Sequence, residues 1–111
     1  MDPVCTIDAN GDKHWYLDGK LDRKGDLPAI ERANGDKHWY LDGLLHRKGG
    51  RPAIEYFDGH KEWYVNGLLH REGDLPAVEC TNRDQFWYLN GKLIRSSSWE
   101  DDSDDDMLYW D

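Results

Sequence analysis

The chain is poor in the aliphatic side chains that usually build a hydrophobic core. Leu, Ile, Val and Phe together number 21 of its 111 residues, and the formal net charge is −9. Such a composition by itself favours disorder. Cysteine is also scarce, because only Cys5 and Cys80 are present and neither has a second thiol or a histidine at metal-ligand spacing. Two free thiols in a reducing compartment are expected rather than a disulfide.

Long apolar runs are lacking as well. Nowhere do about 18 apolar residues run together, the length that a membrane-spanning helix requires. The opening Met1–Val4 has no basic segment and no apolar stretch, so a secretory signal is not expected. We therefore expect one small domain of an intracellular protein, with no membrane partner.

Aromatic residues and charge are distributed in a way that counters the expectation of disorder. Six Trp and six Tyr supply the large apolar surfaces that an ordered core needs. Residues 96–111 hold seven acidic side chains and no Lys or Arg, whereas residues 1–95 hold 16 acidic and 14 basic ones. The chain is therefore divided into a nearly neutral domain, 1–95, and an acidic-aromatic tail, 96–111.

A period of 24 residues organises the domain. Trp recurs at this spacing and is followed each time by Tyr, Gly, Leu and Arg, which indicates one structural unit used four times. The units are roughly 4–27, 28–51, 52–75 and 76–97. The repeated tryptophans are Trp15, Trp39, Trp63 and Trp87, and the repeated arginines Arg23, Arg47, Arg71 and Arg95 are expected to pair across strands with Glu31, Glu55 and Glu79.

Each unit is predicted to be a β-hairpin or meander. Short alternating segments are separated by Asn-Gly or Asp-Gly pairs, which favour primed turns. In residues 36–41, Trp39 and Leu41 share one face, expected to point to the core, while His38 and Tyr40 share the other. A unit this short must stack on its neighbours to bury its tryptophan. The expected fold is all-β: tandem 24-residue hairpin or meander repeats in an elongated twisted antiparallel sheet, followed by a flexible acidic tail.

The fourth unit departs from the other three. Arg83 takes the place of a turn glycine, and Phe86 and Ile94 replace polar residues of earlier units. Terminal units of stacked arrays are usually atypical, because one side has no neighbour. We therefore expect Phe86 and Ile94 to form a cap.

One segment carries a family resemblance. Residues 63–77 read Trp-Tyr-Val-Asn-Gly-Leu-Leu-His-Arg-Glu-Gly-Asp-Leu-Pro-Ala. This pattern resembles the W-Y-x-N-G-x-x-H-R-x-x-G-P-A repeats of phage and large DNA virus proteins, a MORN-like variant repeat family, and it covers about residues 4 to 95. The resemblance implies a meandering β-sheet, a binding or scaffolding role and a viral or phage source. Asp22 and Ile94 stand where the pattern has His, which argues against a role needing four equivalent histidines.

Patterns for catalysis, cofactors and metals are missing from the sequence. It has no strand-turn-helix nucleophile elbow and no phosphate-binding loop. Paired carboxylates are plentiful only in the tail, where a fixed separation and split pKa values are not expected. The five histidines do not recur as a complete ligand set. We therefore expect no enzyme activity, no catalytic residue, no cofactor and no metal.

The repeated tyrosines form a candidate partner-binding row on the face opposite the tryptophans. Tyr is enriched at protein interfaces, whereas direct nucleic-acid binding is disfavoured because the domain has no basic footprint. A ladder that only stabilises the sheet through cross-strand pairs is the open alternative. The row comprises Tyr16, Tyr40, Tyr64 and Tyr88.

The tail carries the strongest functional signal. Its acidic run is followed by the apolar cluster Met107–Trp110, which solubility does not require. Charge would steer a basic partner to the tail and the aromatic rings would anchor it; the open alternative is that this cluster folds back over the array. The candidate binding residues of the tail are Trp99, Asp101, Asp102, Asp104, Asp105, Asp106, Leu108, Tyr109 and Trp110.

Three functions from different classes fit these features. The first is a non-enzymatic protein-binding repeat module that engages a basic or nucleic-acid-binding partner protein through its sheet face and its tail. The alternative is an inhibitor of a host nucleic-acid-binding or defence protein, anti-CRISPR-like, in which the tail carboxylates mimic phosphates. The third is an assembly protein that forms homo-oligomers through exposed edge strands.

Overall fold

The structure is a computed structural model that describes residues 2–97. All regular elements of this part of the chain are β-strands joined by turns, which confirms the all-β prediction. The strands are β1 (Val4–Ile7), β2 (Lys13–Leu17), β3 (Lys20–Leu21), β4 (Ile30–Glu31), β5 (Lys37–His38), β6 (Tyr40–Leu41), β7 (Leu44–Leu45), β8 (Ile54–Glu55), β9 (Lys61–Glu62), β10 (Tyr64–Val65), β11 (Leu68–Leu69), β12 (Val78–Glu79), β13 (Gln85–Leu89) and β14 (Lys92–Ser96).

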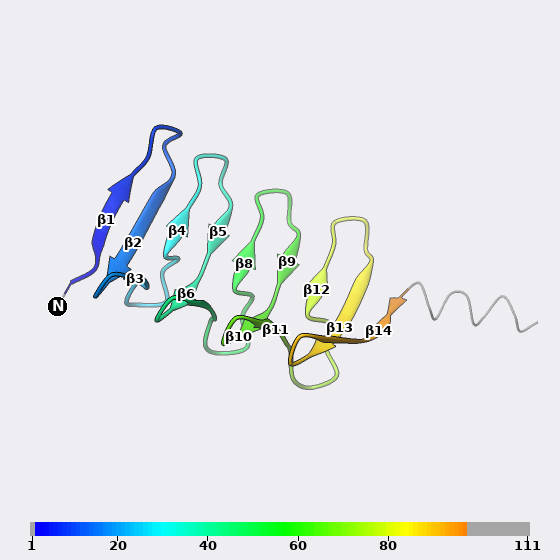
Figure 1. Ribbon diagram of the computed structural model, residues 1–111. Coiled ribbons are helices and arrows are strands. Elements are labelled where there is room, and N and C mark those ends of the chain that lie inside the picture. The colour runs from blue at the N-terminus through cyan, green and yellow to red at the C-terminus, as the bar shows by residue number, and fades with distance from the viewer. Residues whose placement is uncertain (1, 98–111) are drawn as a thin grey trace, which may run out of the picture.

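The strands form one long open sheet and two short hairpins. The main sheet has the order β1-β2-β4-β5-β8-β9-β12-β13-β14, with β3 paired to β2, and every pairing is antiparallel. The hairpins β6–β7 and β10–β11 lie along the lower side of this sheet (Figure 1). No helix in residues 2–97 is long and apolar enough to cross a membrane.

The continuous strand expected over residues 36–41 is wrong, because the chain changes partners at the tryptophan. The backbone N–H of Trp39 donates to Ala53 of the next unit at 2.7 Å, while its carbonyl accepts from His46 of its own unit at 3.0 Å. Above Trp39 the chain therefore belongs to the main sheet, and below it to a separate hairpin. Leu41 belongs to this separate hairpin and is 39% exposed. The expectation that Leu41 points to the core is therefore also wrong.

Turns of two kinds connect the strands. The lower pairs, such as Asp42-Gly43 and Asn66-Gly67, have positive φ at both residues, as primed turns require. In the upper pairs, such as Asn34-Gly35, only the second residue has a positive φ. The N–H of Gly35 donates to the carbonyl of Arg32. The upper connections are therefore not the primed turns that the sequence predicts but the longer hairpin loop that ends in one left-handed residue. Arg83 occupies that left-handed position with φ 78°.

In the second unit a neighbouring side chain also limits what can stand at this position. A Cβ on Gly35 would lie 3.3 Å from the Cβ of Phe57, one unit further along. Arg83 belongs to the fourth unit, the last in the described sheet. Ile94 is 48% exposed, so the expected cap does not include it, whereas Phe86 is half-buried and pairs with Val78 and Ser96.

Cross-strand register aligns equivalent residues into rows. One face carries a row running through the pairs His14–Ile30, Ile30–His38 and His38–Ile54. On the opposite face, cationic and acidic side chains alternate from strand to strand, which favours this register over a slipped one. That alternating row comprises Lys13, Glu31, Lys37, Glu55, Lys61, Glu79 and Gln85.

The core is thin and recurs from unit to unit. Trp39, Trp63 and Trp87 are only 6 to 7% exposed, which confirms their predicted burial. The expected burial of Trp15 is wrong, because this tryptophan of the first unit has no preceding unit to pack on and is only half-buried. Beside the three buried tryptophans lie alanines with no exposed surface, while Ile30 and Ile54 are buried on the other face. The fully buried alanines are Ala29, Ala53 and Ala77.

Backbone and carboxylate hydrogen bonds join successive units above and below this core. The Asp12 carboxylate accepts from the N–H of Ala33 at 2.8 Å, and that of Asp36 from Phe57 at 2.8 Å. Below, the N–H of Gly43 donates to Leu21 at 2.9 Å. Because every contact reaches only the adjacent unit, stability is distributed along the array rather than held in one centre.

Candidate binding groove

Each repeated tryptophan carries an arginine on its ring. The guanidinium carbon of Arg47 lies 3.7 Å from the ring centroid of Trp39. A cation over an indole face contributes roughly 0.5 to 2 kcal/mol. The equivalent distances are 3.6 Å for Arg23 on Trp15, 3.7 Å for Arg71 on Trp63 and 4.0 Å for Arg95 on Trp87.

The same tryptophans hold the loops that link the units. The indole N–H of Trp39 donates to the carbonyl oxygen of Asp26 at 3.1 Å, and that of Trp63 to Gly50 at 2.9 Å. The indole of Trp87 reaches Asp74 in the same manner at 3.2 Å. Each loop is therefore fixed to the tryptophan of the following unit, and so is any surface that the loop presents.

The predicted arginine–glutamate pairs are present in the first three units. The Nη1 atoms of Arg23, Arg47 and Arg71 donate to a glutamate eight residues on, and the same atoms donate to the proline carbonyl that opens the next unit. The glutamate distances are 3.0 Å to Glu31, 3.0 Å to Glu55 and 3.1 Å to Glu79, and the carbonyls are those of Pro28, Pro52 and Pro76.

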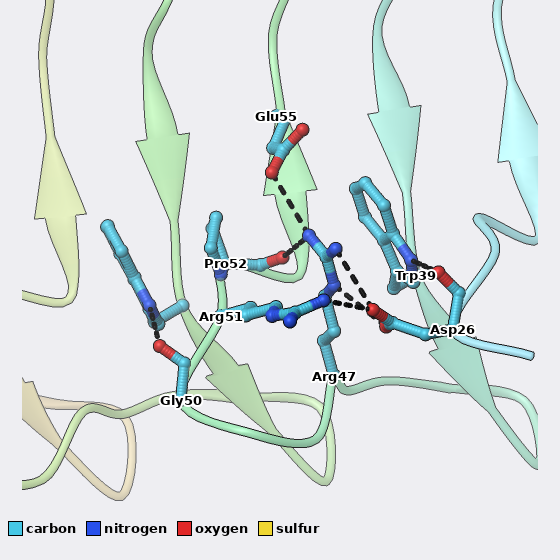
Figure 2. A network of polar contacts seen from close by, with 8 residues as sticks. Asp26, Trp39, Arg47, Gly50, Arg51, Pro52 and Glu55 are labelled. Atoms are coloured by element: carbon cyan, nitrogen blue, oxygen red, sulfur yellow. Dashed lines mark hydrogen bonds and ion pairs between the residues drawn. The ribbon is translucent and has the colours of Figure 1, made fainter.

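Arg47 has further partners that the other two lack. Its Nε and Nη2 atoms donate to the two carboxylate oxygens of Asp26 at 3.0 and 3.3 Å, a bidentate pair. Figure 2 shows the guanidinium between Asp26 on one side and Pro52 and Glu55 on the other. With its side chain 10% exposed, Arg47 works as an internal cross-link rather than as a free cation.

Asp26 joins this centre to a second arginine. Its Oδ2 atom also accepts from Arg51 Nη1 at 2.7 Å, as Figure 2 shows. The hydrogen bond from Arg47 holds the pKa of the Asp26 carboxyl below its ordinary value, with help from the charges of Arg47 and Arg51, although partial burial opposes the shift. Asp26 therefore stays ionised, which keeps the two arginines and the loop in place.

A groove opens beside this network. It has a volume of about 700 Å³ and is lined by Leu17 and by residues 22–27, 39–41, 46–49 and 51. We name it the Arg47 groove. Leu27 and Leu41 in its wall are 46% and 39% exposed, so the groove offers apolar surface to a ligand.

The rim of the Arg47 groove carries unpaired positive charge. Lys24 and Lys48 are exposed and make no hydrogen bond or ion pair with residues 2–97. Arg51 has a side chain that is 63% exposed and uses one nitrogen on Asp26. An ordered apolar wall with free cations around it fits a ligand that has both apolar and negatively charged groups.

The equivalent place at the other end of the array differs in size and charge. A smaller hollow of about 250 Å³ lies among Arg71, Glu72, Asp74 and Trp87. Glu72 stands where Lys24 and Lys48 stand in the earlier units. At this repeat position the smaller hollow therefore has an acidic side chain where the Arg47 groove has cations.

The four predicted tyrosines are all half-buried, and they do not share one environment. Tyr40 lines the Arg47 groove and Tyr88 lines the smaller hollow. Tyr64 donates its hydroxyl proton to Glu62 at 3.0 Å; burial and the Glu62 charge raise the pKa of this phenol. Tyr16 lies on β2 and is paired in register with Leu21. The structure thus brings only Tyr40 together with the groove.

Sequence reasoning missed the lysines and leucines of the groove. Lys24, Lys48, Leu27 and Leu41 were not among the candidate residues, because each looks like an ordinary surface or core residue by itself. The signal lay in the period, since the position nine residues after Trp is Lys in the first two units and Glu72 in the third.

The histidines of the lower hairpins have structural partners. Nδ1 of His46 accepts from the N–H of Asn66 at 3.1 Å, and Nδ1 of His70 from Asn90 at 2.9 Å. In the first unit a carboxylate oxygen of Asp22 accepts from Asp42 at 3.1 Å. Asp replaces His in the repeated pattern because either side chain supplies the acceptor that the next unit needs.

A second group of titratable side chains lies in the middle of the main sheet. His60 Nε2 lies 2.8 Å from Glu62, and the rings of Tyr56 and His60 meet edge to face at 4.9 Å. Burial, with the Arg32 charge, lowers the pKa of His38, whose Nε2 atom is buried without a hydrogen-bond partner. Among residues 2–97, no three His, Cys, Asp or Glu side chains are placed to hold a metal ion.

The candidate residues of the tail, from Trp99 to Trp110, lie outside the described residues. Comparisons of the chain with protein-family models, with curated proteins and with solved structures gave no match.

Proposed function

We propose that this chain is a non-enzymatic protein-binding module built from tandem 24-residue β-hairpin repeats, MORN-like in pattern and of viral or phage origin. Its repeats form an elongated twisted sheet that presents the tyrosine face, and the acidic-aromatic tail extends the binding surface toward a basic partner. The observation that carries the proposal is the Arg47 groove, in which Tyr40, Leu27 and Leu41 form an apolar wall under free cations.

The construction of the groove supports binding rather than chemistry. Its most buried charged group, Arg47, donates from all three of its guanidinium nitrogens to loop and strand acceptors. Because all three of its nitrogens are engaged, Arg47 has little freedom to act on a ligand, but it makes the wall of the groove rigid. A preorganised surface loses less entropy on binding.

The tail gives the proposal its second contact. Seven acidic residues within 96–111 precede and surround the cluster Met107–Trp110, and such a segment fits a basic surface with an apolar pocket. The same charge supports a second candidate function, in which the tail carboxylates occupy the phosphate sites of a host nucleic-acid-binding or defence protein.

The experiment compares capture of proteins from a host lysate by the full-length chain and three full-length variants, at low and high salt. Tyr40→Ala tests the groove, and the triple change Leu108→Ser, Tyr109→Ser, Trp110→Ser tests the tail. The control is Phe57→Ser, because Phe57 is 70% exposed and lies on an upper turn away from the groove. Circular dichroism verifies that all variants remain folded.

We expect Tyr40→Ala and the tail variant each to reduce the amount of a common captured protein at least fivefold, while Phe57→Ser leaves it unchanged. Equal capture by all four proteins would contradict the binding module. The mimicry function predicts that added DNA or RNA displaces the captured protein. It also predicts that the amount of captured protein falls steeply between low and high salt. These two results together favour mimicry over simple docking.

A further inference from the structure

We infer that the Arg47 groove binds the chain's own C-terminal segment, residues 98–111, in the same molecule. This inference deepens the proposed function, on which it rests, because it names the ligand that occupies the groove before a partner arrives. The partner would then compete with the tail, and the groove and the tail would become available together.

Charge complementarity is the first argument. Residues 98–111 contain seven acidic side chains and no basic one. The rim of the groove carries Lys24 and Lys48, neither of which has an ionic partner within residues 2–97, and the largely exposed Arg51. Opposite charges at a water-filled rim attract over about one Debye length, roughly 8 to 10 Å at moderate salt.

Apolar complementarity is the second argument. The tail ends in Met-Leu-Tyr-Trp before its last residue, and each of these side chains gains by leaving water. The groove offers the half-buried ring of Tyr40 and the exposed side chains of Leu27 and Leu41. A segment with an acidic run beside an aromatic cluster matches a groove with a cationic rim beside an apolar wall.

A difference between repeat units makes the Arg47 groove, and not the smaller hollow, the site for the tail. The smaller hollow near Arg71 is nearer in sequence to the tail, but Glu72 lines it at the repeat position that Lys24 and Lys48 occupy at the rim of the Arg47 groove. Like charges facing one another disfavour a complex. Of the two hollows, only the Arg47 groove therefore suits an acidic segment.

The tail is long enough to reach the Arg47 groove. Five strand steps separate β5 from β14 in the sheet order, which at about 4.8 Å per step is about 24 Å. Residues 98–106 span up to about 30 Å when extended, so the cluster that follows them reaches the groove. A tether of this length gives an effective concentration of order 1 mM, which favours the tail of the same molecule over that of a second copy at micromolar protein.

The first test measures competition. A fluorescently labelled peptide with the sequence of residues 98–111 is titrated with the full-length chain and with the full-length tail variant Leu108→Ser, Tyr109→Ser, Trp110→Ser. Loss of the tethered competitor should tighten peptide binding about tenfold, for an intrinsic Kd near 0.1 mM and an effective concentration near 1 mM. Adding Lys24→Glu and Lys48→Glu to the tail variant should abolish binding, whereas Lys92→Glu, at an exposed position of β14 outside the groove, should not.

The second test locates the contact by amide NMR of the full-length chain and the tail variant. We expect shift differences at Gly25, Leu27 and Gly49, and none at Gly73, which occupies the equivalent loop by the acidic hollow. The differences should not depend on protein concentration. Unchanged groove amides overturn the inference, and differences that grow with concentration overturn the assignment to one molecule in favour of a second copy.

The outcomes separate this inference from the proposed function. If Tyr40→Ala abolishes partner capture but the peptide binds both full-length proteins equally, the module binds a partner and the tail does not occupy the groove. If the peptide result is positive and no protein is captured in a Tyr40-dependent way, the tail occupies the groove and the proposed partner binding fails.

Discussion

The surroundings of Arg47 and Arg71 show how one scaffold can yield two different surfaces. Both arginines lie on a buried tryptophan at 3.7 Å, and both donate to a glutamate and a proline carbonyl of the next unit. They differ at the loop residue held by the tryptophan indole, which is Asp26 for Arg47 and Gly50 for Arg71. A single carboxylate therefore separates a fully bonded guanidinium from a partly bonded one.

The comparison teaches where variation is tolerated in such an array. Positions that contact the next unit, such as the tryptophans and alanines, recur because every interface repeats the same geometry. The loop residues at 24, 48 and 72 face solvent, so their charge changes from Lys to Glu without disturbing that geometry. Binding properties can thus differ between units that are structurally equivalent.

The largest expected effect comes from removing each arginine in turn. Arg47→Ala leaves Asp26 and Glu55 without their main cation and uncovers Trp39, so the free energy of unfolding should fall by about 2 to 3 kcal/mol. Arg71→Ala loses fewer bonds and should cost about 1 to 2 kcal/mol. Urea denaturation followed by tryptophan fluorescence measures both values, and equal losses would show that the Asp26 pair adds nothing.

A smaller effect is expected from building the missing carboxylate. Gly50 has φ 71°, close to the 56° of Asp26, and a Cβ there would meet nothing within 4 Å. Gly50→Asp should therefore place a carboxylate beside Arg71. In a double-mutant cycle with Arg71→Ala we expect a coupling of about 1 kcal/mol. A coupling near zero would mean that the loop, and not the residue, determines the pairing of Arg47.

The smallest effect is the pH dependence that Asp26 contributes. Because its pKa is lower in the fold than its ordinary 3.8, its contribution to stability is complete above about pH 5 and is lost as pH falls through the folded pKa. Asp26→Asn should remove this part of the acid destabilisation. Urea titrations between about pH 5 and pH 2 test it, with Asp58→Asn, on an exposed upper turn, as the control. Identical acid profiles for wild type and Asp26→Asn would contradict the assignment.

Much of the fold could be predicted from the sequence because its signals are local and repeated. The Asp-Gly and Asn-Gly pairs predicted the lower primed turns, the tryptophan period predicted the burial of Trp39, Trp63 and Trp87, and the arginine–glutamate spacing predicted the ion pairs. The break at Trp39 could not be predicted, because it depends on which unit supplies each hydrogen-bond partner. The upper turns could not be predicted either, because the same Asn-Gly and Asp-Gly pairs occur in both kinds of turn.

The candidate site, too, could be predicted from the sequence only in part. Tyr40 could be found from the sequence as a half-exposed ring on a strand, but the same reasoning selected Tyr64, whose hydroxyl is bound to Glu62. Lys24 and Lys48 are 24 residues apart in the sequence, and only the stacking of the first two units brings both to one groove with Leu27 and Leu41.

By itself, the sequence determined the all-β character, the 24-residue spacing of the buried tryptophans and the concentration of acidic residues, without Lys or Arg, in residues 96–111. These properties follow from side-chain period, turn chemistry and charge, which are encoded within each unit. The tertiary structure alone decided that Arg47 is an internal cross-link and that a groove with free cations opens beside it. The physical reason is that contacts between units depend on the distance and angle at which neighbouring hairpins stack, and no single unit contains that information.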